Sequence, residues 1–111
     1  MKYSFFLLSL FFASIASAQS VTLLNSGSKA SFRGLSVVSD KIVWVSGTGG
    51  TVGRSTDGGD SWTWMTVKGF EKMDFRDIEA FDEKTAIIMG IADPAYILKT
   101  TDGGLNWRGG R

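Results

Sequence analysis

A chain of 111 residues has the length of one small domain, and its 12 cationic and 11 acidic side chains nearly cancel. This balance argues against a nucleic-acid or membrane-surface protein, because both need a basic patch. The absence of Cys excludes disulfides, thiolate nucleophiles and Cys-ligated metals. The absence of His excludes an imidazole base and a His-ligated zinc. The composition therefore predicts neither a cofactor nor a metal site.

The N-terminus has the pattern of a secretory signal peptide. Lys2 gives a positive start, Phe5–Phe12 is an apolar run, and Ala16–Ala18 supplies the small residues that signal peptidase recognises. The apolar run is too short for a membrane span, which needs about 20 residues. We expect cleavage after Ala18 and export of residues 19–111 to the periplasm or the medium. No stable membrane anchor is expected after cleavage, and there is no Cys for a lipoprotein anchor.

The rest of the chain contains an internal repeat. Residues 55–62 read STDGGDSW and residues 100–107 read TTDGGLNW, which places their aspartates 45 residues apart. Upstream, Phe32 and Phe75 are each followed by Arg and lie 43 residues apart. A period of about 40–50 residues is typical of propeller blades, each of which is a four-stranded antiparallel sheet.

Short β-branched and aromatic runs between Gly-rich turns predict an all-β fold, and no window has the period of an amphipathic helix. The first repeat, about residues 31–67, contains four such runs, and the second, about 74–107, contains three. Too few residues follow Trp107 for a further strand, so we expect two blades, the second incomplete. The runs are Leu35–Val38, Ile42–Val45, Thr51–Arg54, Trp62–Val67, Ile78–Phe81, Ala86–Met89 and Tyr96–Lys99.

Two blades do not make a closed propeller, which needs at least about four, because each blade covers its faces only with its neighbours. We therefore interpret residues 19–111 as the N-terminal part of a larger propeller. Val21–Leu24 fits neither blade and is expected to complete the last blade of the closed ring. A small sandwich that folds alone is the alternative.

The repeated motif resembles the Asp box, or BNR repeat, S-x-D-x-G-x-[ST]-W. The arrangement of residues 32–62 around it is similar to that in exported β-propellers of the photosystem II stability/assembly factor-like family. The resemblance extends over about Val21–Trp107 and implies a non-catalytic protein that binds other proteins as an assembly or stability factor. Asp boxes also occur in sialidases, other glycosidases and receptors, so the motif indicates a fold more than an activity.

Structural roles explain the residues of the box. A carboxylate at the turn accepts backbone N–H groups, paired glycines supply positive φ, and a Trp buries its ring between blades. Calcium held by Asp57 and Asp60 is not expected, because calcium needs about six oxygen ligands. The residues with this expected structural role are Ser55, Asp57, Gly59, Trp62, Thr100, Asp102, Gly104 and Trp107.

Two other patterns suggest enzymes. Residues 47–53, GTGGTVG, resemble a nucleotide loop but lack the last Gly of a dinucleotide fingerprint and the Lys of a Walker A motif. They are better interpreted as a turn between strands, although some relatives of this type are labelled oxidoreductases. Phe32-Arg33 resembles the Phe-Arg-Ile-Pro segment of sialidases, whose Arg binds the substrate carboxylate. After the signal segment Tyr96 is the only Tyr and the carboxylates are not paired, so no catalytic residue is assigned.

A sialidase-like propeller that binds or cleaves glycans stays open as the alternative function, with its catalytic residues in further blades. The favoured function depends on Arg33 and Arg76, which occupy matched positions and would lie on one face of the ring. The assembly-factor family is similar in presenting arginines on a propeller face to a partner protein. The resemblance thus implies that these two arginines contribute to docking a protein partner.

Overall fold

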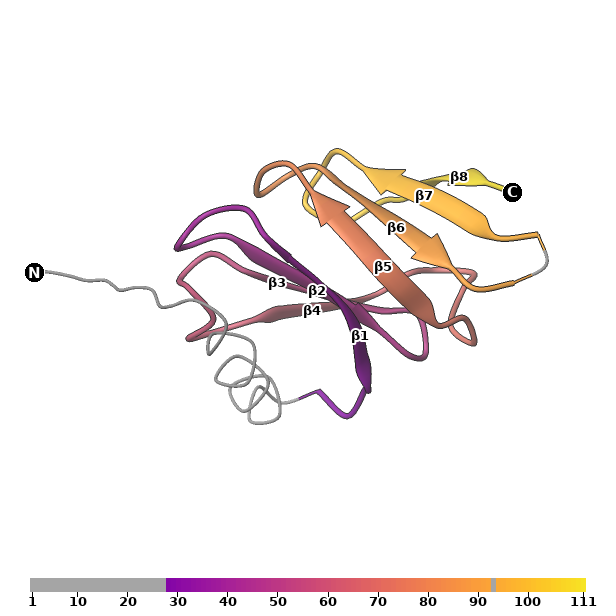
Figure 1. The fold of residues 1–111 in the computed structure, drawn as a ribbon, viewed down its shortest axis with the longest axis horizontal. Helices are drawn as coiled ribbons and strands as arrows, with labels where there is room; N and C mark the ends of the chain where they lie inside the picture. Colours follow the sequence, from indigo (N-terminus) through magenta and orange to yellow (C-terminus); the bar gives the residue numbers. More distant parts are fainter. Residues whose placement is uncertain (1–27, 93) are drawn as a thin grey trace, which may run out of the picture.

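The structure, a computed structural model, describes residues 28–92 and 94–111, which form two four-stranded antiparallel sheets (Figure 1). In each sheet the strands lie side by side in chain order, so each repeat is a meander of three hairpins. The all-β, blade-like prediction is confirmed. The first sheet contains β1 (Phe32–Val37), β2 (Val43–Gly47), β3 (Thr51–Ser55) and β4 (Thr63–Thr66). The second contains β5 (Phe75–Ala80), β6 (Ala86–Gly90), β7 (Tyr96–Thr100) and β8 (Arg108–Gly110).

The prediction that the second repeat lacks a fourth strand is wrong. Arg108–Gly110 forms the short strand β8, which pairs antiparallel with β7 and places Gly109 opposite Leu98. Two of its three residues are glycines, so its backbone pairs with β7 without a pattern of apolar side chains. A strand of this kind gives no periodic signal in the sequence.

Two segments singled out in the sequence lie outside the described residues. These are the predicted signal peptide, residues 1–18, and the expected closing strand, Val21–Leu24. Residues 28–92 and 94–111 include no helix long and apolar enough to cross a membrane.

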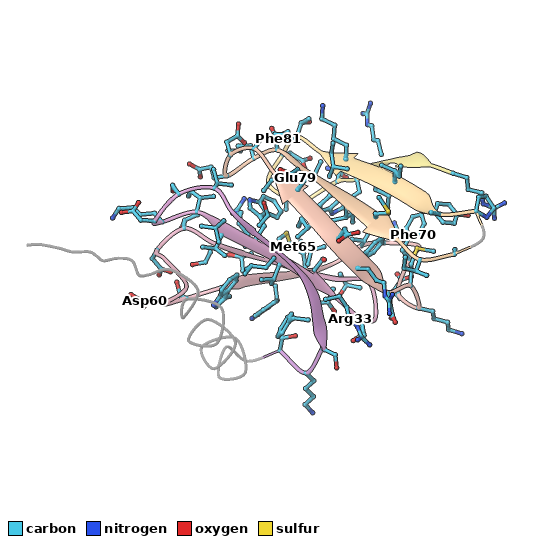
Figure 2. All side chains as sticks on the ribbon, in the orientation of Figure 1. Arg33, Asp60, Met65, Phe70, Glu79 and Phe81 are labelled. Carbon is cyan, nitrogen blue, oxygen red and sulfur yellow. The ribbon has the colours of Figure 1, made fainter. Side chains whose placement is uncertain are left out.

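The core of the molecule lies between the two sheets. Trp44 and Val52 from the first sheet are fully buried, and they pack with Phe75 and Ile88 from the second. Figure 2 shows Met65 of β4 in this space, partly buried against the core. The Trp44 ring also meets the Trp107 ring edge to face, with centroids 6.4 Å apart. Because both sheets contribute apolar faces, the main core is shared between the repeats.

Polar contacts join the same two sheets. The Trp44 Nε1–H donates to the carbonyl oxygen of Asp82 at 3.0 Å, and the amide of Ala80 donates to Ser36 Oγ at 2.9 Å. The second contact links β1 to β5, the first strand of each sheet. Figure 1 shows these two strands as neighbours where the sheets meet. The sheets are thus joined by specific hydrogen bonds as well as by apolar packing.

Equivalent residues of β1 and β5 differ in how far they are buried. Ile78 and Ala80 of β5 are 7% and 9% exposed, whereas their equivalents in β1, Leu35 and Val37, are 43% and 53% exposed. The contrast arises because Ile78 and Ala80 face the first sheet, which covers them. Among the described residues, no further sheet covers the equivalent face of β1, where Leu35 and Val37 lie. This one-sided covering is how blades stack in a propeller.

Candidate functional site

The first Asp box is a hydrogen-bonded turn between β3 and β4. Ser55 Oγ donates to Asp57 Oδ1 at 2.8 Å and accepts the amide of Gly59 at 2.8 Å. Asp57 Oδ1 also accepts the amide of Ser61 at 2.8 Å, and its Oδ2 accepts the Ser61 hydroxyl. Trp62 closes the turn by donating its Nε1–H to the carbonyl oxygen of Gly59 at 3.0 Å.

The second Asp box repeats this network with different side chains. Thr100 Oγ1 donates to Asp102 Oδ1 at 2.8 Å and accepts the amide of Gly104 at 2.9 Å. Asn106 donates both its backbone amide and its side-chain amide to the Asp102 carboxylate, at 2.9 and 2.8 Å. Trp107 Nε1–H donates to Gly104 O at 3.1 Å. Thr and Asn therefore perform the same hydrogen-bonding roles as the serines of the first box.

The hydrogen bonds account for the electrostatics of both boxes. Donation from the Ser61 hydroxyl and amide, and then from Ser55, lowers the pKa of Asp57 to about 2. Donation from the Asn106 side chain and amide, and then from Thr100, lowers the pKa of Asp102 to about 2. Each carboxylate is thus committed to its own turn as an acceptor. Such a group serves the turn rather than acid–base catalysis, which favours a pKa nearer the working pH.

The two Trp rings of the boxes lie in different surroundings. Trp107 contacts Trp44 across the sheets, as expected for a ring between blades. Trp62 stacks instead on Trp64 of its own sheet, with centroids 5.5 Å apart. Trp64 also stacks on Phe32, at 5.3 Å, so three aromatic rings lie in a row on the outward face of the first sheet.

Arg33 and Arg76 are each the extra residue of a β-bulge. In the first sheet Phe32 pairs with Gly47 and Gly34 pairs with Ser46, which leaves Arg33 between them without a partner residue. The second sheet repeats this irregularity at Arg76, between Phe75 and Asp77. Both arginines are exposed, whereas the Phe before each is at least half-buried. Bulges of this kind redirect a side chain and are frequent next to functional sites.

The two bulges lie next to each other in space. A Cβ atom placed on Gly34 would lie 3.1 Å from the carbonyl oxygen of Arg76, so β1 and β5 approach closely at this level. Figure 2 shows Arg33 at the start of β1, far from Asp60 in the Asp-box turn at the other end of the sheet. Arg33 and Arg76 thus form an arginine rim at the end of the sheets opposite the Asp boxes.

An open hollow of about 570 Å³ adjoins the arginine rim. It lies between the β4–β5 loop, the start of β5 and the residues that flank the β6–β7 loop. Phe70 and Tyr96 form an aromatic wall, and Ile91 and Arg76 also line the hollow. The hollow is within the usual volume range for a binding site, about 300–1,000 Å³. We call it the Phe70 pocket.

Sequence reasoning missed Arg54, which crosses from the first sheet to the second. Its Nη1 donates to the carbonyl oxygens of Glu83 and Gly103, at 3.0 and 3.2 Å, and its guanidinium lies 5.8 Å from the centre of the Trp44 ring. The repeat could have drawn attention to Arg54, because a cationic residue directly precedes each Asp box: Arg54 the first and Lys99 the second. Within the part of the chain that the structure describes, no three His, Cys, Asp or Glu residues are grouped to hold a metal ion.

The repeated meander, the shared core and the two Asp-box turns define the class of protein: these are two adjacent blades of a β-propeller. No protein-family model matches the chain, and neither does any curated protein.

Solved structures of YCF48, a photosystem II assembly factor, are similar to this chain. One, described as YCF48 bound to D1 peptide, is 27% identical and matches 76% of this chain with a TM-score of 0.61. YCF48 from Cyanidioschyzon merolae is 26% identical and matches 75% of the chain with a TM-score of 0.55. The match spans 27% of the length of each YCF48 chain. The resemblance to the photosystem II assembly-factor propellers is confirmed.

Proposed function

We propose that this protein is an exported, non-catalytic propeller that binds a protein chain through the arginine rim and acts in assembling or stabilising a protein complex. The observation that carries the proposal is the repeated bulge, which leaves both Arg33 and Arg76 exposed in adjacent strands. A single bulged Arg would be a local irregularity. Two at matched positions place two cations at the same end of neighbouring blades.

Arginine suits this role chemically. Its guanidinium is always charged and forms paired hydrogen bonds with carboxylates and backbone carbonyls. Exposed charges of this kind raise the association rate more than they stabilise the final complex, and salt weakens their effect. The similar YCF48 structure with a D1 peptide supports a peptide segment as the type of ligand.

The test uses the full chain and a fluorescein-labelled D1 peptide, followed by fluorescence anisotropy at low and high ionic strength. We expect wild-type protein to bind and Arg33→Gln/Arg76→Gln to bind about tenfold more weakly at low salt, which corresponds to about 1.4 kcal/mol. The difference should shrink at high salt. The matched control, Lys41→Gln, removes an exposed cation from the β1–β2 turn and should change little.

Equal binding by the double variant would contradict the arginine rim, and no binding of the D1 peptide at all would contradict a D1-type ligand. Unfolding of the double variant, visible by circular dichroism, would show that the arginines are structural. Hydrolysis of a fluorogenic sialoside by the wild type, lost in the double variant, would favour the sialidase-like alternative.

Export is the second part of the proposal and is supported by the signal pattern of residues 1–18. We expect cleavage between Ala18 and Gln19, and the exposed Gln19 can then cyclise. The intact mass of the protein recovered from the periplasm or medium measures this directly. A product that retains residues 1–18, or that stays in the cytoplasm, would overturn it.

A further inference from the structure

We infer that the Phe70 pocket receives an apolar side chain from an extended, acidic segment of the protein partner. This inference rests on the proposed function and names the part of the partner that the site would select. It depends on three properties of the pocket: its apolar wall, the cations around it and the fixed position of its loop.

The wall offers apolar surface that remains accessible. Ile91 is 54% exposed, and Phe70, Met73 and Tyr96 are each only half-buried. Phe70 and Tyr96 meet edge to face with ring centroids 5.1 Å apart, so the wall presents aromatic surface. Apolar and aromatic side chains that remain exposed in a concave site typically mark a place where a partner's side chain is buried.

Cations outnumber acids around this wall. Lys72 and Arg76 line the pocket and are exposed, and Asp74 is the acid that lines it with them. A further cation lies alongside, because Arg111 Nε donates to the Tyr96 hydroxyl at 3.0 Å and its guanidinium lies 5.1 Å from the ring centre. Two cations and one acid line the pocket, and Arg111 and Glu71 lie alongside, the latter because its carboxylate accepts the amide of the lining residue Gly69 at 3.1 Å. The resulting excess of positive charge favours a ligand with negative charge beside its apolar group.

The loop that forms the pocket is held from several sides. The Met73 carbonyl oxygen accepts the Gly50 amide at 2.7 Å, and the Asp74 carbonyl oxygen accepts the Ile91 amide at 3.2 Å. The Phe70 ring packs on the ring of Phe75 in the core, with centroids 6.2 Å apart. The Phe70 carbonyl oxygen accepts the Met73 amide at 3.0 Å. Because these contacts fix the loop before binding, little ordering entropy is lost when a ligand enters.

Arg76 connects the pocket to the arginine rim. It lines the pocket and is also the bulged residue of β5, next to Arg33 in β1. A peptide that places an apolar side chain against Phe70 would therefore have its neighbouring carboxylate within the reach of Arg76. Figure 2 shows Phe70 and Arg33 on the side of the molecule away from the Asp60 turn.

The test uses three fluorescein-labelled twelve-residue peptides, of alternating glutamate and leucine, glutamate and serine, or lysine and leucine. Anisotropy titrations are made with the full chain. We expect the glutamate–leucine peptide to bind about tenfold more tightly than the glutamate–serine peptide, the factor that corresponds to burying one aliphatic side chain. It should also bind more tightly than the lysine–leucine peptide, because Lys72 and Arg76 repel the lysines of that peptide. Equal binding of the glutamate–serine peptide would mean that charge alone acts, and would overturn the pocket.

Two pocket variants sharpen the test. Ile91→Ser removes exposed apolar surface from the wall, and Lys72→Gln removes an exposed cation, so each should weaken glutamate–leucine binding several-fold. Only the effect of Lys72→Gln should fade at high salt. Lys41→Gln, outside the pocket, is the matched control and should have no effect. Unchanged binding in Ile91→Ser would contradict the inference.

The same variants separate this inference from the proposed function. If Arg33→Gln/Arg76→Gln loses the D1 peptide while Ile91→Ser binds it normally, the arginine rim stands and the pocket fails. If Ile91→Ser loses the peptide and Arg33→Gln alone binds it normally, the pocket stands without the two-arginine rim. Normal binding in all variants overturns both.

Discussion

Gly53 lies directly opposite Trp64 in the paired strands β3 and β4, and the indole ring occupies the space that a Cβ atom on residue 53 would need. In the second sheet the large side chain and the glycine exchange strands. There Leu98 lies opposite Gly109, which sits at the position equivalent to Trp64. Each repeat thus pairs one large side chain with one glycine, but on opposite strands.

Substitution of Gly53 tests this relationship. Gly53→Ala should lower the free energy of unfolding by about 1–3 kcal/mol, because the methyl group would collide with the Trp64 ring and with Val45. Chemical denaturation of the full chain measures the change. Gly110→Ala is the control, since a Cβ there meets nothing within 4 Å, and it should be neutral. Equal losses in the two variants would argue against the close packing of Gly53 under the ring.

Arg54 should be the strongest polar link between the sheets. Arg54→Met keeps most of the aliphatic stem but removes the hydrogen bonds to Glu83 and Gly103. We expect a loss of about 1.5–3 kcal/mol, the usual range for hydrogen bonds to a charged group. The matched control is Lys99→Met, because Lys99 holds the equivalent position in the second sheet and is exposed. If both variants lose the same stability, Arg54 does not link the sheets.

The Asp boxes predict how stability depends on pH. Asp57 and Asp102 have pKa values of about 2 in the folded protein, below the ordinary value of 3.8. Because the folded state binds these protons less readily than the unfolded state, the stabilisation is present above about pH 4 and is lost as the pH falls toward 2. Replacing both residues, Asp57→Asn/Asp102→Asn, should lower Tm at neutral pH and flatten the decline of Tm between these two pH values.

A pH series of thermal unfolding curves checks this prediction. Asp60→Asn is the control: it lies in the same turn, and among the described residues its carboxylate accepts none of the hydrogen bonds that close the turn. It should leave the pH profile unchanged. A double variant with the wild-type decline would show that the two boxes do not cause the acid sensitivity.

The sequence predicted most of the fold because the features that form it repeat. Two Asp boxes 45 residues apart, with β-branched runs between them, identify hairpins of fixed length. The short strand β8 escaped prediction because two glycines leave it no apolar pattern. Strand β8 is held by pairing with the backbone of β7, and the residues of β8 alone do not predict that pairing.

The candidate site was only partly predictable. The matched positions of Arg33 and Arg76 are visible in the repeat, but the bulge that separates each from its strand partner depends on the register with β2 or β6. Neither the bulge nor the Phe70 pocket follows from local sequence, because each requires strands or loops distant in the chain to meet. Arg54 was missed for the same reason, since its partners lie 29 and 49 residues away.

The central claim, that the arginine rim is where the partner binds, can be tested by site-specific cross-linking. The chain has no Cys, so Ser31→Cys beside the rim and Asp60→Cys at the opposite end each give one site for a benzophenone label. Both positions are exposed, and both variants retain Arg33 and Arg76. After irradiation with the D1 peptide, we expect a cross-linked product, detected by mass spectrometry, from the label at position 31 and none from position 60. Cross-linking from position 60 and not from position 31 would contradict the account.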